Sequence, residues 1–365
     1  MFSPKIPKIS SIQVARIVDI VRHRVGQLHR NMVPPPAAMM EMISNAWVAQ
    51  AITAAADLGI ADALANGPLS ADELADAVDA DADTVGRLLR ALIGRGVFRQ
   101  LRDGRYALNP LADTLRSDGD VSLRGFARYV GAPQHREHWS NVTTAIRTRR
   151  SVVPEMRGKP IFDYLSGEKE LDENFNEAMT NISELAIPSV IAGYDFSRYG
   201  TIVDVAGGRG RLLAAILNAT PQARGILFDQ PHVVADAPPL LKQHRVADRV
   251  KLVEGSFFEN VAEGGDAYVL KHIIHDWPDD QALQILRNVR KAAGLGKHVL
   301  LVEMVLPGHD RDFVGNWLDL EILVEFDARE RTAAGYAQLL GRAGFRMTRV
   351  VETVSPYSVV EAIAV

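Results

Sequence analysis

From residue 200 onward, short apolar segments alternate with helical segments, and this alternation constrains the fold more than any other feature of the chain. Five segments rich in valine, isoleucine and leucine are predicted to be strands, at 201–205, 225–228, 250–253, 267–270 and 298–305. Helices are predicted between them at 212–217, 233–241 and 281–292. This pattern indicates an α/β fold, with a mostly parallel sheet covered by helices on both faces. Ligands of such sheets bind beyond the carboxyl ends of the strands, so site residues are expected there.

A glycine-rich loop follows the first of these strands. It runs from Asp204 through Gly207 and Gly208 to Gly210, directly before the next helix. Glycine lets the backbone turn sharply and approach a ligand closely, because it has no Cβ. The carboxylate of Asp204 would repel a pyrophosphate but attract the positive sulfonium and amino groups of S-adenosylmethionine. The loop therefore predicts a methyl-donor site at these four residues.

Two alternatives remain for this loop. The first is the dinucleotide fingerprint G-x-G-x-x-G of an NAD-dependent oxidoreductase. Residues 208–213 supply its first two glycines but have leucine at the third position. Binding of a nicotinamide cofactor would distinguish this alternative. The second is a tightly packed turn before a helix that binds no ligand.

Further polar and aromatic side chains stand at the ends of the following strands. Asp229 ends the second strand, about twenty residues after the loop, where a carboxylate can accept both ribose hydroxyl hydrogens. Ser256 and Phe257 end the third strand, and the ring of Phe257 is placed either over an adenine face or in the core. Lys271 ends the fourth strand, where it meets a ligand or pairs with an acid.

Two histidines follow the fourth strand, in the block that runs from Lys271 to Trp277. They are His272 and His275, and a proline with two aspartates then starts a helix, as expected for a first helical turn. Histidine has an unperturbed pKa of about 6.5, which suits proton transfer near neutral pH. A lone histidine is more often structural, but this pair stands at the sheet edge beside the proposed donor site. The block therefore supplies a candidate general base.

The N-terminal third predicts two helices and a hairpin, the pattern of a winged helix. A long helical segment covers residues 39–65, and Ser70 with Glu73 forms a capping box for the next helix. Asp83 or Thr84 is predicted to cap the helix after that. A turn at residues 103–104 then joins two short strands.

A winged helix raises DNA binding as an alternative function. Arg87, Arg90 and Arg95 are placed to lie on a recognition helix. However, residues 69–110 carry seven acids against six bases, and three aspartates stand at the start of that helix. Phosphate contacts supply much of the affinity for DNA, and this charge balance opposes them. A structural or dimerising winged helix is the favoured interpretation, with no nucleic-acid partner.

The remaining segments complete a prediction of four regions. Residues 11–30 form an amphipathic helix, which packs on protein or, as an alternative, lies on a membrane surface. Residues 120–195 are mainly helical, with an interruption at Pro188. The predicted regions are an N-terminal arm at 1–36, a winged helix at 37–115, a helical linker with acceptor-pocket residues at 116–195 and a Rossmann-like domain at 196–365.

Composition excludes several classes of protein. The net charge of −4 gives no basic field for nucleic acid, and the absence of cysteine excludes disulfides and thiolate sites. No apolar run reaches the roughly 18 residues of a membrane helix. A cytoplasmic protein without a membrane partner is expected.

Six motifs together resemble a known family. They are Asp204-Val-Ala-Gly-Gly-Arg-Gly210, Asp229-Gln-Pro231, Gly255-Ser-Phe-Phe258, Leu270-Lys-His-Ile-Ile-His-Asp-Trp277, Val302-Glu303 and Arg329-Glu-Arg-Thr332. From about residue 39 to the C-terminus the chain resembles the large S-adenosylmethionine-dependent O-methyltransferases, the class of plant caffeic acid, acetylserotonin and bacterial polyketide methyltransferases. The resemblance implies a homodimer built on a winged-helix dimerisation domain, with a Rossmann-like catalytic domain and a small hydroxylated acceptor.

The resemblance also implies roles for particular residues. It makes His275 the general base, flanked by Glu303 and Glu330, either of which would orient the imidazole. Gly207, Gly208, Asp229 and Lys271 would contact the donor. Phe162, Phe175 and Met179 would line the donor and acceptor pockets, with hydrophobic core as the alternative. No metal site is evident in the sequence, so metal-independent methyl transfer is expected.

The sequence departs from the family pattern at two places. Ser256 stands where the family commonly has aspartate, and Ala206 and Arg209 replace a frequent glycine and threonine. A serine hydroxyl still forms hydrogen bonds, and alanine suits the loop if its φ is negative. These differences keep open a relative that holds the cofactor without transferring a methyl group.

Overall fold

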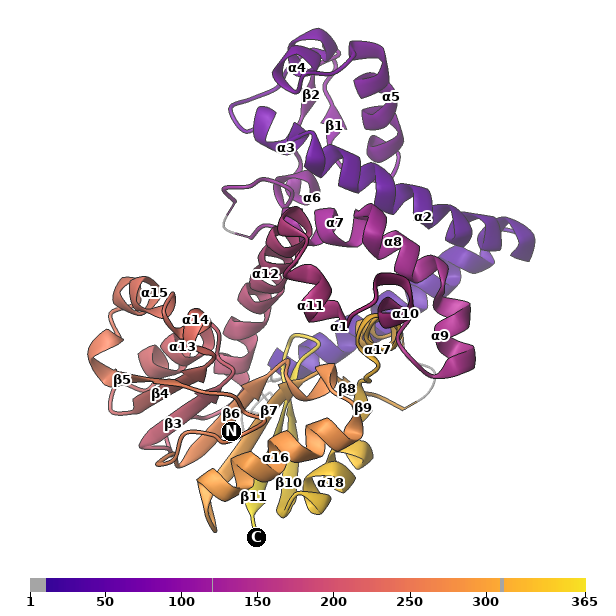
Figure 1. Cartoon of the computed structure of the whole chain (residues 1–365). Coiled ribbons are helices and arrows are strands. Elements are labelled where there is room, and N and C mark those ends of the chain that lie inside the picture. The colour runs from indigo at the N-terminus through magenta and orange to yellow at the C-terminus, as the bar shows by residue number, and fades with distance from the viewer. Residues whose placement is uncertain (1–10, 120, 309–311) are drawn as a thin grey trace, which may run out of the picture. The chain divides into compact units, whose positions relative to one another are not determined.

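The computed structural model describes residues 11–119, 121–308 and 312–365 (Figure 1). Contacts within the chain divide it into two units. The first unit contains the described residues of 186–365 together with 143–153 and 11–23. The second contains residues 24–142 and 154–185. The long helices α1 (Ser11–Asn31) and α12 (Lys169–Gly193) each contribute several residues to both units.

A seven-stranded sheet forms the centre of the first unit, in the order β10-β11-β7-β6-β3-β4-β5. The first five strands in sequence run parallel, whereas β11 is antiparallel to both β7 and β10. The strands are β3 (Thr201–Val205), β4 (Arg224–Asp229), β5 (Val250–Glu254), β6 (Ala267–Lys271), β7 (His298–Glu303), β10 (Phe345–Glu352) and β11 (Ser358–Ala364). The predicted α/β class and all five predicted strands are confirmed, but Met304 separates β7 from a short strand, β8 (Val305–Leu306), which pairs with β9 (Arg331–Thr332).

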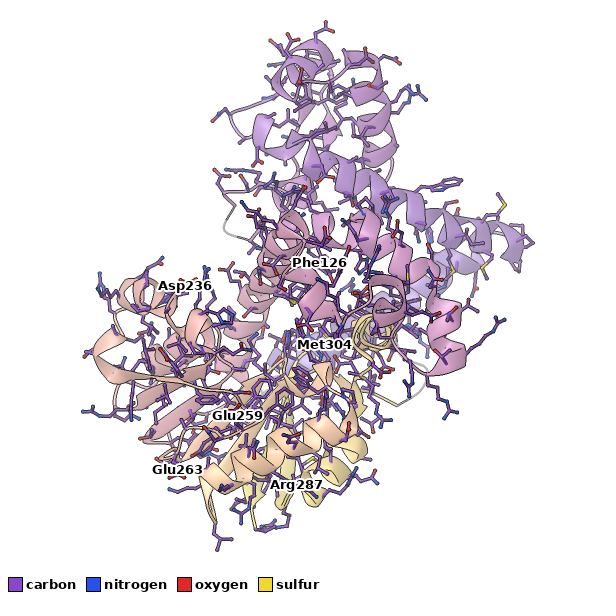
Figure 2. The ribbon with its side chains drawn as sticks, viewed as in Figure 1. Phe126, Asp236, Glu259, Glu263, Arg287 and Met304 are labelled. Atoms are coloured by element: carbon purple, nitrogen blue, oxygen red, sulfur yellow. The ribbon has the colours of Figure 1, made fainter. Side chains whose placement is uncertain are left out.

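Helices pack on this sheet because their apolar faces match its buried strands. Residues of α16 and α18 share one core cluster with β3, β6, β7 and β11. Charged side chains point away from it, among them Asp236, Glu259, Glu263 and Arg287, all exposed (Figure 2). The helices after β3 are α13 (Arg211–Ala219), α14 (Pro231–Val234), α15 (Ala237–Gln243), α16 (Asp279–Ala293), α17 (Val314–Phe326) and α18 (Ala333–Arg342). The helix predicted at 233–241 is therefore two helices.

The second unit contains the predicted winged-helix pattern. Its core is formed by apolar residues of α2 to α6 and of strand β2 (Tyr106–Ala107), which pairs with the exposed strand β1 (Arg99–Gln100) in the hairpin. The helices before β3 are α2 (Pro35–Asp57), α3 (Ile60–Ala63), α4 (Ala71–Ala77), α5 (Ala82–Ile93), α6 (Pro110–Asp113), α7 (Arg124–Gly131), α8 (Pro133–Ser140), α9 (Val142–Thr148), α10 (Val153–Arg157) and α11 (Ile161–Leu165). The capping box of Ser70 and Glu73 is present, with both hydrogen bonds formed.

Two local predictions were wrong. The cap of α5 is Asp81, whose carboxylate accepts the N–H of Thr84 at 2.9 Å, and neither Asp83 nor Thr84 is the cap. Pro188 does not interrupt the helical segment but lies inside α12, which continues to Gly193. Ile187 and Val190 on either side are buried, so packing holds this helix together despite the missing N–H. Within the described residues, each helix is too short or too polar to cross a membrane.

Candidate active site

The carboxyl edge of the sheet gathers the predicted site residues because three adjacent strands end there. Strands β3, β6 and β7 are neighbours. Asp204 lies near the end of β3, Lys271 ends β6 and Glu303 ends β7. The parallel order therefore brings together side chains that are far apart in sequence.

The glycine loop leaves no room for a side chain at Gly207. A Cβ at Gly207 would lie 2.5 Å from Cγ of Asp204 and 2.5 Å from Cδ1 of Leu227, which is closer than real contacts allow. Gly208 adopts φ +60°, and its N–H donates to Oδ2 of Asp229 at 2.8 Å. The other oxygen of Asp229 accepts the N–H of Gln230 at 2.7 Å. A carboxylate has further lone pairs, so Asp229 keeps capacity to accept hydroxyl groups of a ligand.

Ala206 does not meet the condition of a negative φ under which alanine suits the loop. Its φ is +54°, in the left-handed region that an L-residue with a Cβ adopts at a cost. Its N–H donates to the carbonyl of Phe228 at 2.8 Å, which fixes the loop to β4. The loop therefore holds alanine in a conformation that suits glycine.

Asp204 is a buried carboxylate that is suited to a cationic ligand. It is 2% exposed, and its Oδ2 has no hydrogen-bond partner among the described residues. Burial raises the pKa of Asp204 to about 7, and the positive charge of Lys271 opposes this rise. Burial lowers the pKa of Lys271 in turn, against the negative charges of Asp204 and Glu303. An orphaned carboxylate beside Gly207, where a Cβ cannot be placed, fits the predicted sulfonium donor.

A pocket opens beside the loop at the ends of β4 and β5. It is lined by Phe228, Asp229, Gln230, Gly255, Ser256, Phe257, Phe258 and Trp277. The ring centroids of Phe257 and Trp277 are 5.9 Å apart, edge to face. The Ser256 hydroxyl accepts the N–H of Phe258 at 3.3 Å and keeps its own hydrogen to donate. Sequence reasoning missed Gln230 and Trp277 as lining residues, although both stand in quoted motifs.

His275 lies on a one-turn 3₁₀ helix, η2 (Ile274–Asp276), and is 5% exposed. Its Nδ1 is 2.6 Å from Oε1 of Glu330 but 3.9 Å from Oε2 of Glu303. Oε1 of Glu303 instead accepts the backbone N–H of Ile274 at 3.0 Å. The two glutamates therefore do different things: Glu330 bonds the ring, and Glu303 bonds the backbone of its turn.

Negative charge surrounds His275 on several sides. Burial alone lowers the pKa of His275, but the charges of Asp276, Glu303 and Glu330 outweigh it and raise the pKa to about 10. Oδ1 of Asp276 lies 3.3 Å from Nε2, a neighbour that sequence reasoning did not single out. Burial raises the pKa of Glu303 to about 7 and that of Asp276 to about 6. The cluster therefore retains protons at neutral pH.

The same three residues form a group of metal-ligand type, which was not recognised in the sequence. Ligand atoms of His275, Glu303 and Glu330 lie within 4.8 Å of one another. Two ligands at about 2.0–2.2 Å from a tetrahedral ion stand roughly 3.3 Å apart. The 2.6 Å contact between His275 and Glu330 is shorter and has the length of a charge-assisted hydrogen bond. The observed geometry suits proton sharing.

His272 lies against the same group but is held differently. Its φ is +55°, and its ring centroid lies 4.5 Å from that of Tyr357 and 5.3 Å from that of His275, tilted against both rings. Burial lowers the pKa of His272 well below its usual value, so this ring is neutral. The two histidines of the motif therefore differ in charge at neutral pH: His272 is neutral, whereas His275 is protonated.

The predicted acceptor-pocket residues lie in helices of the second unit. Phe162 is on α11, and Phe175 and Met179 are on α12. The rings of Phe162 and Phe175 are 6.4 Å apart, and Phe175 also contacts Tyr129 at 5.1 Å. Phe162 and Met179 are 39% and 37% exposed, so they are not simple core residues. Their role in a pocket stays a prediction.

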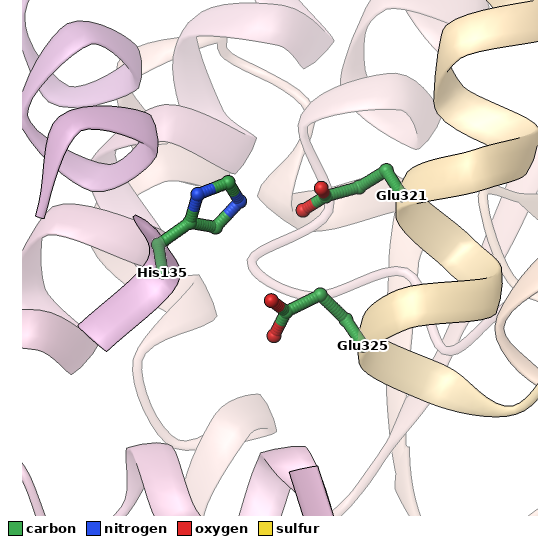
Figure 3. A group of neighbouring side chains, drawn as sticks. All are labelled: His135, Glu321 and Glu325. Carbon is green, nitrogen blue, oxygen red and sulfur yellow. The ribbon is translucent and has the colours of Figure 1, made fainter. Parts of the chain in front are cut away.

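Acidic residues on α17 were not singled out in the sequence. Glu321 and Glu325 project from the same side of this helix, one turn apart (Figure 3). Glu325 is 1% exposed. A residue spacing of four on a helix produces this alignment.

Comparison with known proteins agrees with this architecture. Residues 139–346 match the O-methyltransferase domain family, and residues 40–118 match the O-methyltransferase dimerisation domain. The phenazine O-methyltransferase PhzM of Lysobacter antibioticus is 40% identical over 330 residues, 90% of this chain and 96% of that protein. An 8-amino-8-demethylriboflavin N,N-dimethyltransferase of Streptomyces davaonensis is 31% identical over 86% of this chain and 94% of that protein.

A solved structure extends the comparison to the fold. It is an O-methyltransferase from neocarzinostatin biosynthesis, in complex with S-adenosylmethionine and 2-hydroxy-5-methyl naphthoic acid. It is 32% identical, with a TM-score of 0.74, and covers 87% of this chain and 96% of that chain. The chain belongs to the S-adenosylmethionine-dependent O-methyltransferase family and carries its dimerisation domain. This finding supports the predicted class of enzyme and its cofactor over an NAD-dependent oxidoreductase.

Proposed function

We propose that this enzyme methylates a hydroxyl group of a small aromatic molecule, with His275 as the general base. The observation that carries the proposal is the 2.6 Å contact between Nδ1 of His275 and Glu330, at the sheet edge beside the glycine loop. Bound S-adenosylmethionine supplies a methyl group already activated by its sulfonium. The chain has to align the acceptor and remove the hydroxyl proton.

The residues of the loop hold the donor in this proposal. Asp204 attracts its positive charge, and Asp229 accepts hydroxyl hydrogens while its own position is fixed by Gly208 and Gln230. Phe257 and Trp277 offer apolar faces in the pocket at the end of β5. Gly207 and Gly210 keep the backbone close, and Ser256 and Lys271 add polar contacts.

In this proposal Nε2 of His275 accepts the proton of the acceptor, because Nδ1 is bound to Glu330. Glu330 accepts the hydrogen of Nδ1, so in the neutral ring the lone pair lies on Nε2. His275 has to lose its extra proton before it can act as a base, because its pKa is raised to about 10. A cationic ligand nearby favours that loss, since like charges disfavour the imidazolium. Glu330 and the neighbouring carboxylates then stabilise the imidazolium that forms when the acceptor is deprotonated.

The relatives support an aromatic acceptor from secondary metabolism. They do not decide whether oxygen or nitrogen accepts the methyl group, so that question needs an experiment. Their names include both O- and N-methyltransferases. The enzyme acts as a homodimer in this proposal, through its dimerisation domain. Phe162, Phe175 and Met179 line the acceptor pocket.

The test is a screen of paired aromatic compounds with isotopically labelled donor. Each pair has a hydroxyl or an amine at the same ring position. Label in the hydroxylated member supports the proposal, and label only in amines assigns the enzyme to nitrogen methylation. Donor binding by calorimetry without label in any compound would indicate a relative that does not transfer methyl groups.

The base is tested separately with His275→Ala. We expect loss of turnover by about 10²–10⁴-fold, with donor affinity largely retained, because general-base help has that size. His244→Ala is the matched control, since His244 lies at the end of α15 away from the cluster. Full activity in His275→Ala would remove His275 from the mechanism.

A further inference from the structure

The short turn that carries His275 is held at its beginning by Glu303. Oε1 of Glu303 accepts the N–H groups of Ile273 and Ile274, at 3.3 and 3.0 Å. These are the N–H groups at the start of η2. A turn of three residues has few hydrogen bonds of its own, so its geometry depends on such side chains.

Arg331 holds the other side of the same turn. Its guanidinium donates to the carbonyl of Ile274 at 3.0 Å and to the carbonyl of Trp277 at 3.3 Å, one on each side of His275 and Asp276. It also donates to Oδ1 of Asp279, at the first turn of α16, at 2.7 Å. Arg331 is 5% exposed, so these bonds form away from water.

The placement of Arg331 in sequence adds to its effect. It directly follows Glu330 and begins strand β9 (Arg331–Thr332), in which Arg331 pairs with Val305 of β8. Glu330 bonds the ring of His275, while Arg331 bonds the backbone on both sides of it. One dipeptide therefore sets both the orientation of the imidazole and the position of its Cα.

We propose that Arg331 is a positioning residue for the general base. This inference rests on the proposed function of His275. Arg331 touches neither ligand site nor the imidazole in the described contacts and acts through the turn. Loss of its hydrogen bonds lets residues 274–277 shift, and a displacement of about 1 Å at a reacting group costs as much as 10²-fold in rate.

Lysine cannot replace arginine in this role. The planar guanidinium presents donors in a fixed fork and reaches two carbonyls and a carboxylate at once. An ammonium on a flexible stem keeps the positive charge and can pair with Asp279. Arg331→Lys therefore keeps the positive charge at this position but removes the fixed geometry of the hydrogen bonds.

The experiment compares Arg331→Lys with Arg329→Gln in the full-length enzyme. Arg329 also bonds Asp279 but is 60% exposed at its side chain and donates to no carbonyl of the turn. We expect Arg331→Lys to lower kcat by about 10–100-fold with unchanged donor Kd. Arg329→Gln should keep kcat within about twofold of the original enzyme, because its bond is at the surface. Thermal melts and donor titrations establish that both variants are folded.

Two further readouts distinguish positioning from a merely structural role. The ¹⁵N resonances of the His275 ring report its protonation and its bond to Glu330 without any need for turnover. They should change in Arg331→Lys and not in Arg329→Gln. Added guanidinium should restore part of the kcat of Arg331→Ala but none of that of His275→Ala.

The outcomes decide the proposal. Unchanged kcat and unchanged His275 resonances in folded Arg331→Lys would overturn it. Altered His275 resonances in an enzyme whose His275→Ala variant keeps full activity would retain the positioning role of Arg331 but reject His275 as the base. If Arg331→Ala does not fold, Arg331→Lys and the resonances still decide.

Discussion

Nδ1 of His275 lies 2.6 Å from Oε1 of Glu330, whereas the nearest oxygen of Glu303 is 3.9 Å away. The two acids that flank the proposed base are therefore not equivalent. Only Glu330 is in hydrogen-bond contact with the ring, and it is positioned to fix the tautomer and stabilise the imidazolium. Glu303 bonds the N–H groups of the turn instead.

Substitution of each glutamate by glutamine should separate these roles. We expect Glu330→Gln to lower kcat by about 10²-fold or more, because an amide cannot stabilise the imidazolium by charge. Glu303→Gln should cost less in kcat, since its carbonyl oxygen can still accept the N–H of Ile274. Steady-state kinetics with a donor titration would check both, and an equal loss in the two variants would contradict the distinction.

Activity and stability should depend on pH in opposite directions. The pKa of His275 is raised to about 10, so its stabilising effect is complete below the unfolded value of about 6.5 and is lost as the pH rises toward 10. The raised pKa values of Glu303 and Asp276 act in the same direction, because the folded state binds their protons more tightly. In the proposed mechanism, however, His275 acts as the base only after it loses its proton.

We therefore expect kcat/KM to rise from pH 6 into the alkaline range while the free energy of unfolding falls. Urea unfolding and initial rates at the same series of pH values would measure both. In His275→Ala the rise in kcat/KM should disappear. A rate that is highest at pH 6 would contradict the proton assignment.

Donor affinity should depend on Asp204. Asp204→Asn removes the buried negative charge, and we expect the Kd of S-adenosylmethionine to rise by tenfold or more, which corresponds to about 1.4 kcal/mol. Asp236→Asn is the control, because Asp236 is exposed and pairs with Arg209 at the surface (Figure 2). Calorimetric titration measures both variants.

The pH dependence of the same titration is a second check. Burial raises the pKa of Asp204 to about 7, so donor binding should tighten as the pH rises through that value. This dependence should be absent in Asp204→Asn. Equal affinity in the two proteins would show that the donor does not rely on this carboxylate.

Replacing the strained alanine of the loop by glycine should increase the stability of the protein. Ala206 has φ +54°, and Ala206→Gly should raise the free energy of unfolding by about 1 kcal/mol because it relieves that strain. Ala215→Gly, in the middle of α13, should lower the free energy of unfolding by about 1 kcal/mol. Urea unfolding of the two variants should thus move in opposite directions, and a loss of stability in both would mean that Ala206 carries no strain.

The sequence by itself determined the parallel core and the edge where the site forms. Alternating segments of β3 to β7 are recognisable because buried parallel strands are short continuous apolar runs bounded by helices. Asp204, the glycines and His275 were found because they lie at or shortly after the carboxyl ends of such strands. The antiparallel pair β10 and β11 was missed, and Pro188 was misread, because packing across the sheet and around α12 outweighs local preference there.

Only the tertiary structure decided how the site residues are connected. Glu330 and His275 are 55 residues apart, and no spacing rule states which of two glutamates reaches the ring. Three further features likewise depend on how separate strands and loops pack. They are the positive φ of Ala206, the contact of Asp276 with His275 and the hydrogen bonds of Arg331 to the turn. Local sequence specifies which strand ends carry polar groups, whereas hydrogen bonds a few ångströms long are set by how those ends pack.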